Sequence, residues 1–206
     1  FDDHTKLFFP EPGAAFAPPQ VTEEGIDWGE GVRPATRDYT PLYDAERHEL
    51  AYDFYIHDGG IASRWALEAK VGDKLVIGGP RGSLVVPEDY AWQLYVCDES
   101  GMPALRRRLL GLRQLAVTPQ VTAIVTIADA SYKDYQADLD GFNIDWVVGH
   151  NPAFVAERLA QVKVPAEDYF IWLTGEGAVV KSLLARFEDE SIDQQLVRSQ
   201  AYWHSK

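Results

Sequence analysis

The run RDYT (residues 37–40) brings together a guanidinium, an aromatic ring and a hydroxyl just before Pro41. A guanidinium offers a rigid fork of donors to a phosphate, an aromatic face covers an apolar ring system, and a hydroxyl can donate or accept. Side chains alternate along a strand, so Arg37 and Tyr39 would share one side and Thr40 the other. The run therefore predicts either a strand that bends at its end to bind one ligand, or an ordinary strand that stops at a turn.

Two glycine-rich turns follow this run. In HDGGIASRWALEA (57–69) a turn leads into a helix, and Ser63 lies at or just inside the helix N-terminus, where free N–H groups and the dipole favour an anion. In GGPRGS (78–83) flexible backbone surrounds Arg81. Each turn also has an ordinary interpretation, a capped helix start or a tight turn, which its own residues leave open.

The elements that must position these residues fall into two halves. Residues 1–90 are predicted to be mostly strand, at 5–9, at 49–57 with Leu50, Tyr52, Phe54 and Ile56 on one face, and at 73–79, with a surface loop over 11–32. From residue 91 strands alternate with helices. The predicted strands are 93–97, 120–128, 144–149 and 169–175, and the predicted helices are 102–115, 151–162 (Asn151 as N-cap, Pro152 first) and 176–190. This alternation predicts a parallel sheet with crossover helices.

Ligands of such sheets bind beyond the carboxyl ends of the strands, here residues 97–101 and 174–176. The sequence contains neither G-x-G-x-x-G nor G-x-x-x-x-G-K-[ST], so a nucleotide site at these ends needs other support.

Composition narrows the class of protein. The 206 residues include 19 Lys and Arg against 32 Asp and Glu, a net charge of −13, which argues against a nucleic-acid partner. No apolar run is long enough to span a bilayer, and no signal-peptide pattern opens the sequence, so we expect no membrane insertion. The single cysteine, Cys97, is predicted to lie in the core and allows neither an internal disulfide nor a cysteine-held iron–sulfur cluster, which favours a cytoplasmic location.

The basic and metal-binding residues are sparse. Arg37, Arg64 and Arg81 all lie near turns and could gather at one anionic ligand, whereas the triplet at 106–108 spans a wide arc of a helix and is expected at the solvated surface. The five histidines show no ligand spacing, so we expect no metal site in the protein.

Several segments together resemble one family. In order along the chain they are DDHTKLFFP, RDYT, DFYIHDGGIASRWA, GGPRGS, CDESGMPA, WLTGEG and AYWHSK. This ordered set, which covers essentially the whole chain, resembles the siderophore-interacting proteins, flavin-dependent ferric-siderophore reductases. The resemblance implies a β + α/β fold: an antiparallel Greek-key FAD-binding barrel at 1–90, followed by a Rossmann-like α/β NAD(P)H-binding domain at 91–206. Family members carry some tens of residues before the segment DDHTKLFFP, so the first barrel strands are expected to be missing from this sequence.

The resemblance also implies a flavin site. Arg37 would pair with the flavin phosphate, Tyr39 would lie against the cofactor, and Thr40 would bond near its reactive N5 edge, which makes Tyr39 and Thr40 the catalytic candidates. The other implied FAD-binding residues are His57, Ala62, Ser63 and Trp65, around the phosphates and adenine, with Arg81, Gly82 and Ser83.

In the second half, Gly175 and Glu176 would lie next to the nicotinamide. Asp98 and Glu99 could touch its ribose or cap the next helix, and Trp203 could stack on a cofactor or anchor the chain end. Lys181 stands where the family commonly has arginine, so NADH, NADPH and a ferredoxin all remain open as the electron donor.

The implied substrate is a ferric siderophore, which brings Fe(III) wrapped in hard oxygen donors and releases it on reduction to Fe(II). Lys6 and Arg64 are candidates for receiving an anionic ferric complex, or are surface charges. Two alternatives to this reductase stay open: a flavoreductase with a non-iron acceptor, and a non-catalytic flavin- or siderophore-binding protein.

Overall fold

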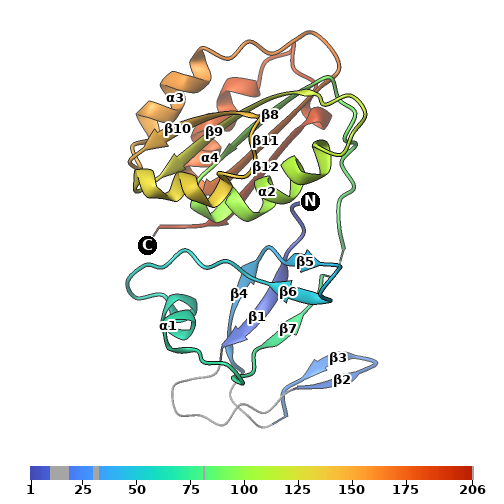
Figure 1. Cartoon of the computed structure of the whole chain (residues 1–206), viewed down its shortest axis with the longest axis vertical. Helices are drawn as coiled ribbons and strands as arrows, with labels where there is room; N and C mark the ends of the chain where they lie inside the picture. The colour runs from blue at the N-terminus through green and yellow to red at the C-terminus, as the bar shows by residue number, and fades with distance from the viewer. Residues whose placement is uncertain (10–18, 30–32, 81, 206) are drawn as a thin grey trace. The chain divides into compact units, whose positions relative to one another are not determined.

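The computed structural model describes residues 1–9, 19–29, 33–80 and 82–205. The chain divides into two compact units, Asp2–Ser83 and Phe1 with Leu84–Lys206, which we call the β unit and the α/β unit (Figure 1). Antiparallel strands in the first and a parallel sheet with helices in the second confirm the predicted fold class. The assignment of 1–90 and 91–206 to separate functional domains stays a prediction.

The β unit is built on a three-stranded antiparallel sheet with the order β4 (Ala35–Tyr39), β1 (Thr5–Phe9) and β7 (Val76–Gly78). Two hairpins, β2 (Gln20–Thr22) with β3 (Gly25–Asp27) and β5 (Leu42–Asp44) with β6 (Glu49–Ala51), and the helix α1 (Ile61–Glu68) complete it. The strand predicted at 5–9 is confirmed as β1. Its residues Leu7 and Phe9 are fully buried and lie in one core cluster with Ala62 of α1.

Three predictions for this unit were wrong in extent. The strand expected over 49–57 ends at Ala51, and among the described residues nothing pairs with 52–57 as a strand. Tyr52 and Phe54 still pack on the core from this irregular segment, whereas Leu50 and Ile56 are exposed. The strand expected over 73–79 shortens to β7. The surface loop expected over 11–32 contains the β2–β3 hairpin, and its residues 11–18 and 30–32 lie outside the described chain.

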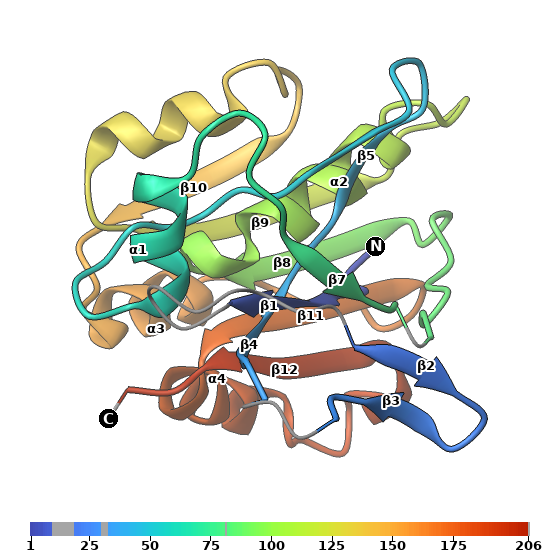
Figure 2. The same ribbon diagram turned by 90° about the horizontal axis from the view of Figure 1, so that it is seen from below.

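The α/β unit contains a sheet of five described strands, all parallel. They are β10 (Asn143–Val148), β9 (Gln120–Ile127), β8 (Trp92–Cys97), β11 (Tyr169–Glu176) and β12 (Val197–Trp203), in that order across the sheet (Figure 2). Four of these strands match the predicted ones, and β12 was not predicted. The chain runs outward from β8 in one direction and then returns to β11 on its other side. The carboxyl ends of β8 and β11 therefore flank the topological switch point, where open α/β sheets bind ligands.

Helices cover both faces of this sheet. The helix α2 (Met102–Leu112) packs on the face that carries Tyr95 and Trp172, and α3 (Pro152–Ala160) and α4 (Gly177–Leu184) pack on the other face (Figure 1). The short 3-10 turns are η1 (Glu99–Gly101), η2 (Ala130–Gln136), η3 (Ala185–Phe187) and η4 (Gln194–Leu196). As predicted, Asn151 caps α3, accepting a hydrogen bond from the Ala153 N–H at 3.0 Å. No helix in the described part of the chain is long and apolar enough to cross a membrane.

The arginine triplet corrects one expectation. Arg108 is only 2% exposed and bonds several groups inside the α/β unit, and Arg106 pairs with Asp138 through both of its terminal nitrogens. The solvated-surface interpretation was wrong because α2 is covered on more than one side. The prediction for Cys97 is confirmed: it is 2% exposed, and burial, followed by the neighbouring carboxylates, raises the pKa of its thiol well above the ordinary value.

Candidate functional site

The first candidate site lies on one face of the β4–β1 pair. Arg37 is opposite Leu7 and Tyr39 is opposite Thr5 in the antiparallel register, so the guanidinium and the phenol project from the same face, as predicted. Thr40 follows the end of β4 and is 6% exposed. The strand thus delivers Arg37 and Tyr39 to one side of the sheet, with a buried hydroxyl just beyond.

Tyr39 is held by its neighbours before any ligand arrives. Its ring centroid lies 4.6 Å from that of Phe54, and its carbonyl accepts a 3.5 Å hydrogen bond from Thr5 Oγ1. Burial raises the pKa of the Tyr39 phenol, against the opposing effect of the Arg37 charge, so the ring stays neutral at physiological pH. A fixed, neutral aromatic face is suited to lying against an apolar ring system.

The second part of this site is the start of α1. Gly60 occupies the N-cap position without a side-chain cap, and a Cβ there would lie 2.8 Å from the His57 ring and 2.9 Å from Ser63 Oγ. Ser63 Oγ is occupied, since it accepts from the His57 N–H at 3.1 Å and donates to the Tyr55 carbonyl at 3.4 Å. The N-cap residue therefore offers the first-turn N–H groups of α1 no side-chain partner, and a larger residue at position 60 would meet the His57 and Ser63 side chains.

These features fit the phosphate groups of FAD. An uncapped helix N-terminus offers N–H donors and a positive dipole end, and the exposed Arg37 guanidinium spends one hydrogen bond on the Thr36 carbonyl at 2.7 Å. Because the Ser63 side chain is buried, Ser63 would bind a phosphate through its backbone N–H rather than through its hydroxyl.

The other predicted FAD-binding residues differ in what the structure says of them. Ala62 is 5% exposed and Trp65 packs 5.9 Å from Phe9, so both belong to the apolar core that supports α1. Gly82 and Ser83 are exposed, and Arg81 lies outside the described residues.

The two predicted substrate residues come from different elements. Lys6 is opposite Asp38 in the register, on the other face of the sheet from Arg37, and its Nζ lies 2.7 Å from Asp38 Oδ1. The positive charge of Lys6 is therefore largely balanced by its partner. Arg64 is exposed on α1, and its guanidinium forms no hydrogen bond or ion pair with another described residue.

The second candidate site is the carboxyl edge of the parallel sheet, at the switch point between β8 and β11. Asp98 Oδ1 accepts bonds from the N–H and the hydroxyl of Ser100 at 2.9 and 2.5 Å. Its Oδ2 accepts from the Glu176 N–H at 3.1 Å and from Trp203 Nε1 at 2.8 Å. One carboxylate thus joins the ends of β8, β11 and β12, and it caps η1, one of the two roles considered for it.

Gly175 and Glu176, the predicted nicotinamide neighbours, are fixed by the same group. Gly175 has φ +136°, and a Cβ on it would lie 2.6 Å from Asp98 Oδ2. Glu176 caps α4, accepting from the Ala178 and Val179 N–H groups at 2.7 and 3.0 Å. Bonds from the Val179 and then the Ser205 N–H groups lower the pKa of Glu176, which is anionic at neutral pH.

Comparison with known families decides what this pair of sites belongs to. The siderophore-interacting FAD-binding domain matches residues 1–84, and the siderophore-interacting protein domain matches residues 90–206. The chain belongs to the siderophore-interacting protein family. The resemblance seen in the sequence motifs is thereby confirmed.

Individual proteins are similar to the chain in sequence or in fold. The NADPH-dependent ferric-chelate reductase of Escherichia coli is 67% identical over 206 residues, which are 100% of this chain and 81% of that protein. A siderophore utilization protein from T. fusca has a TM-score of 0.82 at 29% identity, covering 98% of this chain and 79% of its own. A ferredoxin-NADP+ reductase from Plasmodium falciparum, at 15% identity, shares the fold with a TM-score of 0.68, covering 98% and 82%.

Sequence reasoning about this siderophore-interacting protein missed one polar pair. Glu99 accepts a 2.5 Å bond from the Ala128 N–H at the end of β9, and its two carboxylate oxygens lie 3.0 and 2.9 Å from His150 Nε2 beyond β10. The pair depends on the sheet order, which sets β8, β9 and β10 side by side, and no sequence spacing indicates it. Among the described residues no group of three or more His, Cys, Asp or Glu could hold a metal ion.

Proposed function

We propose that this protein is a flavin-dependent reductase that passes electrons from NADPH through FAD to the iron of a ferric siderophore, releasing Fe(II). The observation that carries the proposal is membership of the chain in the siderophore-interacting family, and the uncapped N-terminus of α1, in the half that matches the FAD-binding domain, supports it. The relative named as an NADPH-dependent ferric-chelate reductase supports both the donor and the acceptor.

Each part of the chain has a distinct task in this proposal. Arg37 and the N-terminus of α1 would hold the phosphates of FAD, Tyr39 would cover its ring system, and Thr40 would bond near its reactive edge. When bound, FAD takes up two electrons as hydride and delivers them singly, which suits a nicotinamide donor and a one-electron iron acceptor. Gly175 and Glu176 would receive the nicotinamide at the edge of the sheet.

The iron would be substrate rather than a resident metal. A siderophore encloses Fe(III) in hard oxygen donors, and reduction to the softer Fe(II) weakens these bonds, so the protein needs no iron ligands of its own. Lys6 and Arg64 would lie on the path of an anionic ferric complex. We place the activity in the cytoplasm, where a chain whose one cysteine is a buried free thiol is stable and where NADPH is available.

The test is anaerobic reduction of a ferric siderophore with a ferrous-specific chelator present to capture the product. The wild-type chain, loaded with FAD, is supplied with NADPH, NADH or a reduced ferredoxin in separate reactions, and the flavin absorbance is followed with the captured Fe(II). We expect flavin bleaching by NADPH and Fe(II) formation in proportion to the NADPH consumed.

Other outcomes would replace the proposal. Bleaching without Fe(II), but with reduction of a quinone, would indicate a flavoreductase with a non-iron acceptor. Bleaching by ferredoxin alone would remove NADPH as the donor. A bound flavin that none of the three donors bleaches would indicate a non-catalytic binder.

A further inference from the structure

A buried polar network in the α/β unit holds a stretch of surface chain. This stretch, residues 84–90, is called the linker here because it begins where the chain leaves the β unit at Ser83. The side chains of Leu84 and Val85 are 53% and 86% exposed, so burial of these side chains does not fix the first part of the linker. Its carbonyl groups are bound instead by two side chains that are almost fully buried, Gln93 and Arg108.

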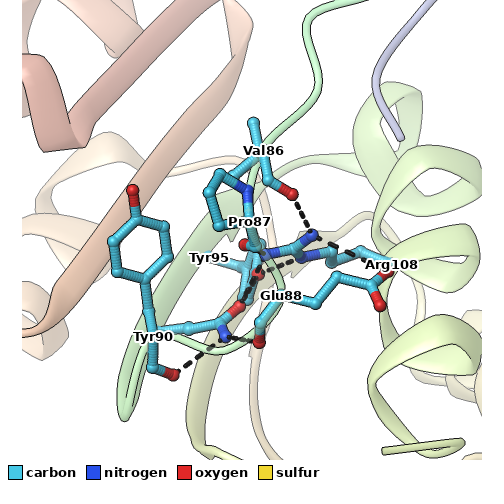
Figure 3. A network of polar contacts seen from close by, with 7 residues as sticks. Val86, Pro87, Glu88, Tyr90, Tyr95 and Arg108 are labelled. Atoms are coloured by element: carbon cyan, nitrogen blue, oxygen red, sulfur yellow. Dashed lines mark hydrogen bonds and ion pairs between the residues drawn. The ribbon is translucent and has the colours of Figure 1, made fainter.

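The guanidinium of Arg108 binds two of these carbonyls. Its Nη1 donates to the Val86 carbonyl at 3.0 Å and its Nη2 to the Pro87 carbonyl at 2.5 Å (Figure 3). Its Nε donates to the Tyr95 hydroxyl at 2.8 Å, which fixes the plane of the fork. A carboxylate oxygen of Glu88 lies 3.9 Å from Nη1.

Gln93 completes the network from β8. Its amide nitrogen donates to the carbonyls of Glu88 at 2.8 Å and Tyr90 at 3.1 Å. Its amide oxygen accepts from Arg108 Nη2 at 3.1 Å and from the Tyr95 hydroxyl. Four carbonyls of the linker are thus held by two side chains, 0% and 2% exposed, that would be left unsatisfied if the linker moved away.

We propose that Arg108 and Gln93 are positioning residues for hydride transfer, which act by clamping the linker to the α/β unit. The inference rests on the proposed function, in which the nicotinamide belongs to one unit and the flavin to the other. Hydride transfer requires a close and aligned approach of the two ring systems, and small misplacements are costly. A linker that is bound to the α/β unit fixes where the chain leaves that unit, and any hinge then lies outside residues 84–90.

The geometry favours this role over a purely structural one. Besides the buried Tyr95 hydroxyl, the network satisfies four carbonyls of a surface segment, which would lose their partners if either side chain were replaced by an apolar one. These bonds, together with the packing of Val86 and Tyr90 on the core, set the path of the linker.

The experiment uses the full chain loaded with FAD and four variants. Gln93→Glu keeps an acceptor for Arg108 but loses both donors to the linker, Arg108→Lys keeps the charge but loses the fork, and Tyr95→Phe removes only the hydroxyl. Arg106→Lys is the matched control. Arg106 lies on the same helix, and its two hydrogen bonds to the Asp138 carboxylate lie outside the linker.

Two quantities are measured for each variant. The first is thermolysin cleavage at residues 84–86, located by mass spectrometry, with cleavage at the exposed Val117 as the internal reference. The second is the stopped-flow rate of flavin reduction at saturating NADPH, beside the KM for NADPH and the flavin content. For Gln93→Glu and Arg108→Lys we expect linker cleavage at least about tenfold faster and flavin reduction at least about tenfold slower, with KM, flavin content and Val117 cleavage unchanged, and intermediate values for Tyr95→Phe.

The outcomes separate this inference from the proposed function. Linker cleavage that matches the Arg106→Lys control in all three variants would overturn the clamp. Faster cleavage with an unchanged rate of flavin reduction would overturn the positioning role. If NADPH fails to reduce the wild-type flavin, the proposed function and the positioning role both fall, and the cleavage assay still decides whether the clamp exists. If Arg108→Lys loses its near-ultraviolet circular dichroism, Tyr95→Phe decides the matter.

Discussion

Gly175 provides a sharp test of the carboxyl edge. Replacing it with alanine places a Cβ 2.6 Å from Asp98 Oδ2 at φ +136°. Gly141 is a matched control, because it has φ +100° and an added Cβ there meets nothing within 4 Å. Both substitutions carry the backbone cost of a side chain at positive φ, about 1–3 kcal/mol, and only Gly175→Ala also displaces a carboxylate.

The additional cost follows from the bonds of that carboxylate. Moving Oδ2 breaks its bonds to the Glu176 N–H and Trp203 Nε1, each worth about 1.5–3 kcal/mol when fully buried. Asp98 is half-buried and Trp203 is 47% exposed, so water recovers part of this, and we expect an extra loss of about 1–3 kcal/mol. For a chain of this length the melting temperature should fall about 2–12 °C further than for Gly141→Ala.

The assay is thermal and urea unfolding of both variants, repeated on an Asp98→Ala background. Without the carboxylate the steric conflict disappears, so the difference between the two glycine variants should shrink to within about 0.5 kcal/mol. The reasoning is wrong if Gly175→Ala costs no more than Gly141→Ala, or if its extra cost persists without Asp98.

Three further predictions concern the sites. Arg37→Ala should lower FAD retention in the purified protein about 10- to 150-fold, because a charge-assisted hydrogen bond is worth about 1.5–3 kcal/mol. Arg47 is an exposed arginine of the same unit, and Arg47→Ala should leave FAD retention unchanged. Equal flavin content in the two variants would remove Arg37 from the site. Because the pKa of Glu176 is lowered in the folded state, its contribution to stability is complete above the ordinary carboxyl pKa, near pH 4.3, and is lost as the pH falls through the folded-state pKa. The difference in unfolding free energy between the wild type and Glu176→Gln should therefore be constant near neutral pH and shrink in acid. A difference that is independent of pH would contradict the capping role. Lys6→Ala should raise KM for an anionic ferric catecholate more than for a neutral ferric hydroxamate, and Asp38→Asn, which frees the Lys6 charge, should lower it; shifts of the same sign in both variants would show that Lys6 does not sense substrate charge.

The α/β unit was readily predicted from the sequence because its strands are buried on both faces. Such strands form continuous apolar runs, such as the run QVTAIVTI of β9, and Asn151 followed by Pro152 marks the start of α3 without reference to distant residues. The strand β12 escaped because VRSQAYW lies at the sheet edge, half-exposed and with polar residues. In the β unit, by contrast, five of the strands have only three residues, which is too short for an alternating pattern to show their limits, and β7 also depends on β1, far along the chain.

The candidate residues divide in the same way. Arg37 and Tyr39 were predictable because one strand carries both, and the alternation of its side chains gives their common face. Arg108 could have been found, since it lies three residues after the buried Leu105 and four before the buried Leu112 on the same helix. The Glu99–His150 pair and the bonds of Asp98 to Glu176 and Trp203 depend on the order of strands in the sheet, which local sequence does not determine.

The two helix starts explain how a chain with a net charge of −13 could bind two anionic cofactors differently. At α1 the N-cap is Gly60 and the first turn contains no acidic residue, so a phosphate placed there would gain N–H donors without a carboxylate of that turn beside it. At α4 the N-terminal N–H groups are already bonded to the anionic Glu176, beside Asp98, so a second anion there would face repulsion. A cofactor bound at α1 is therefore expected to stay, and one at the sheet edge to exchange. This is the behaviour required of a resident flavin and of a nicotinamide that must leave after each hydride transfer.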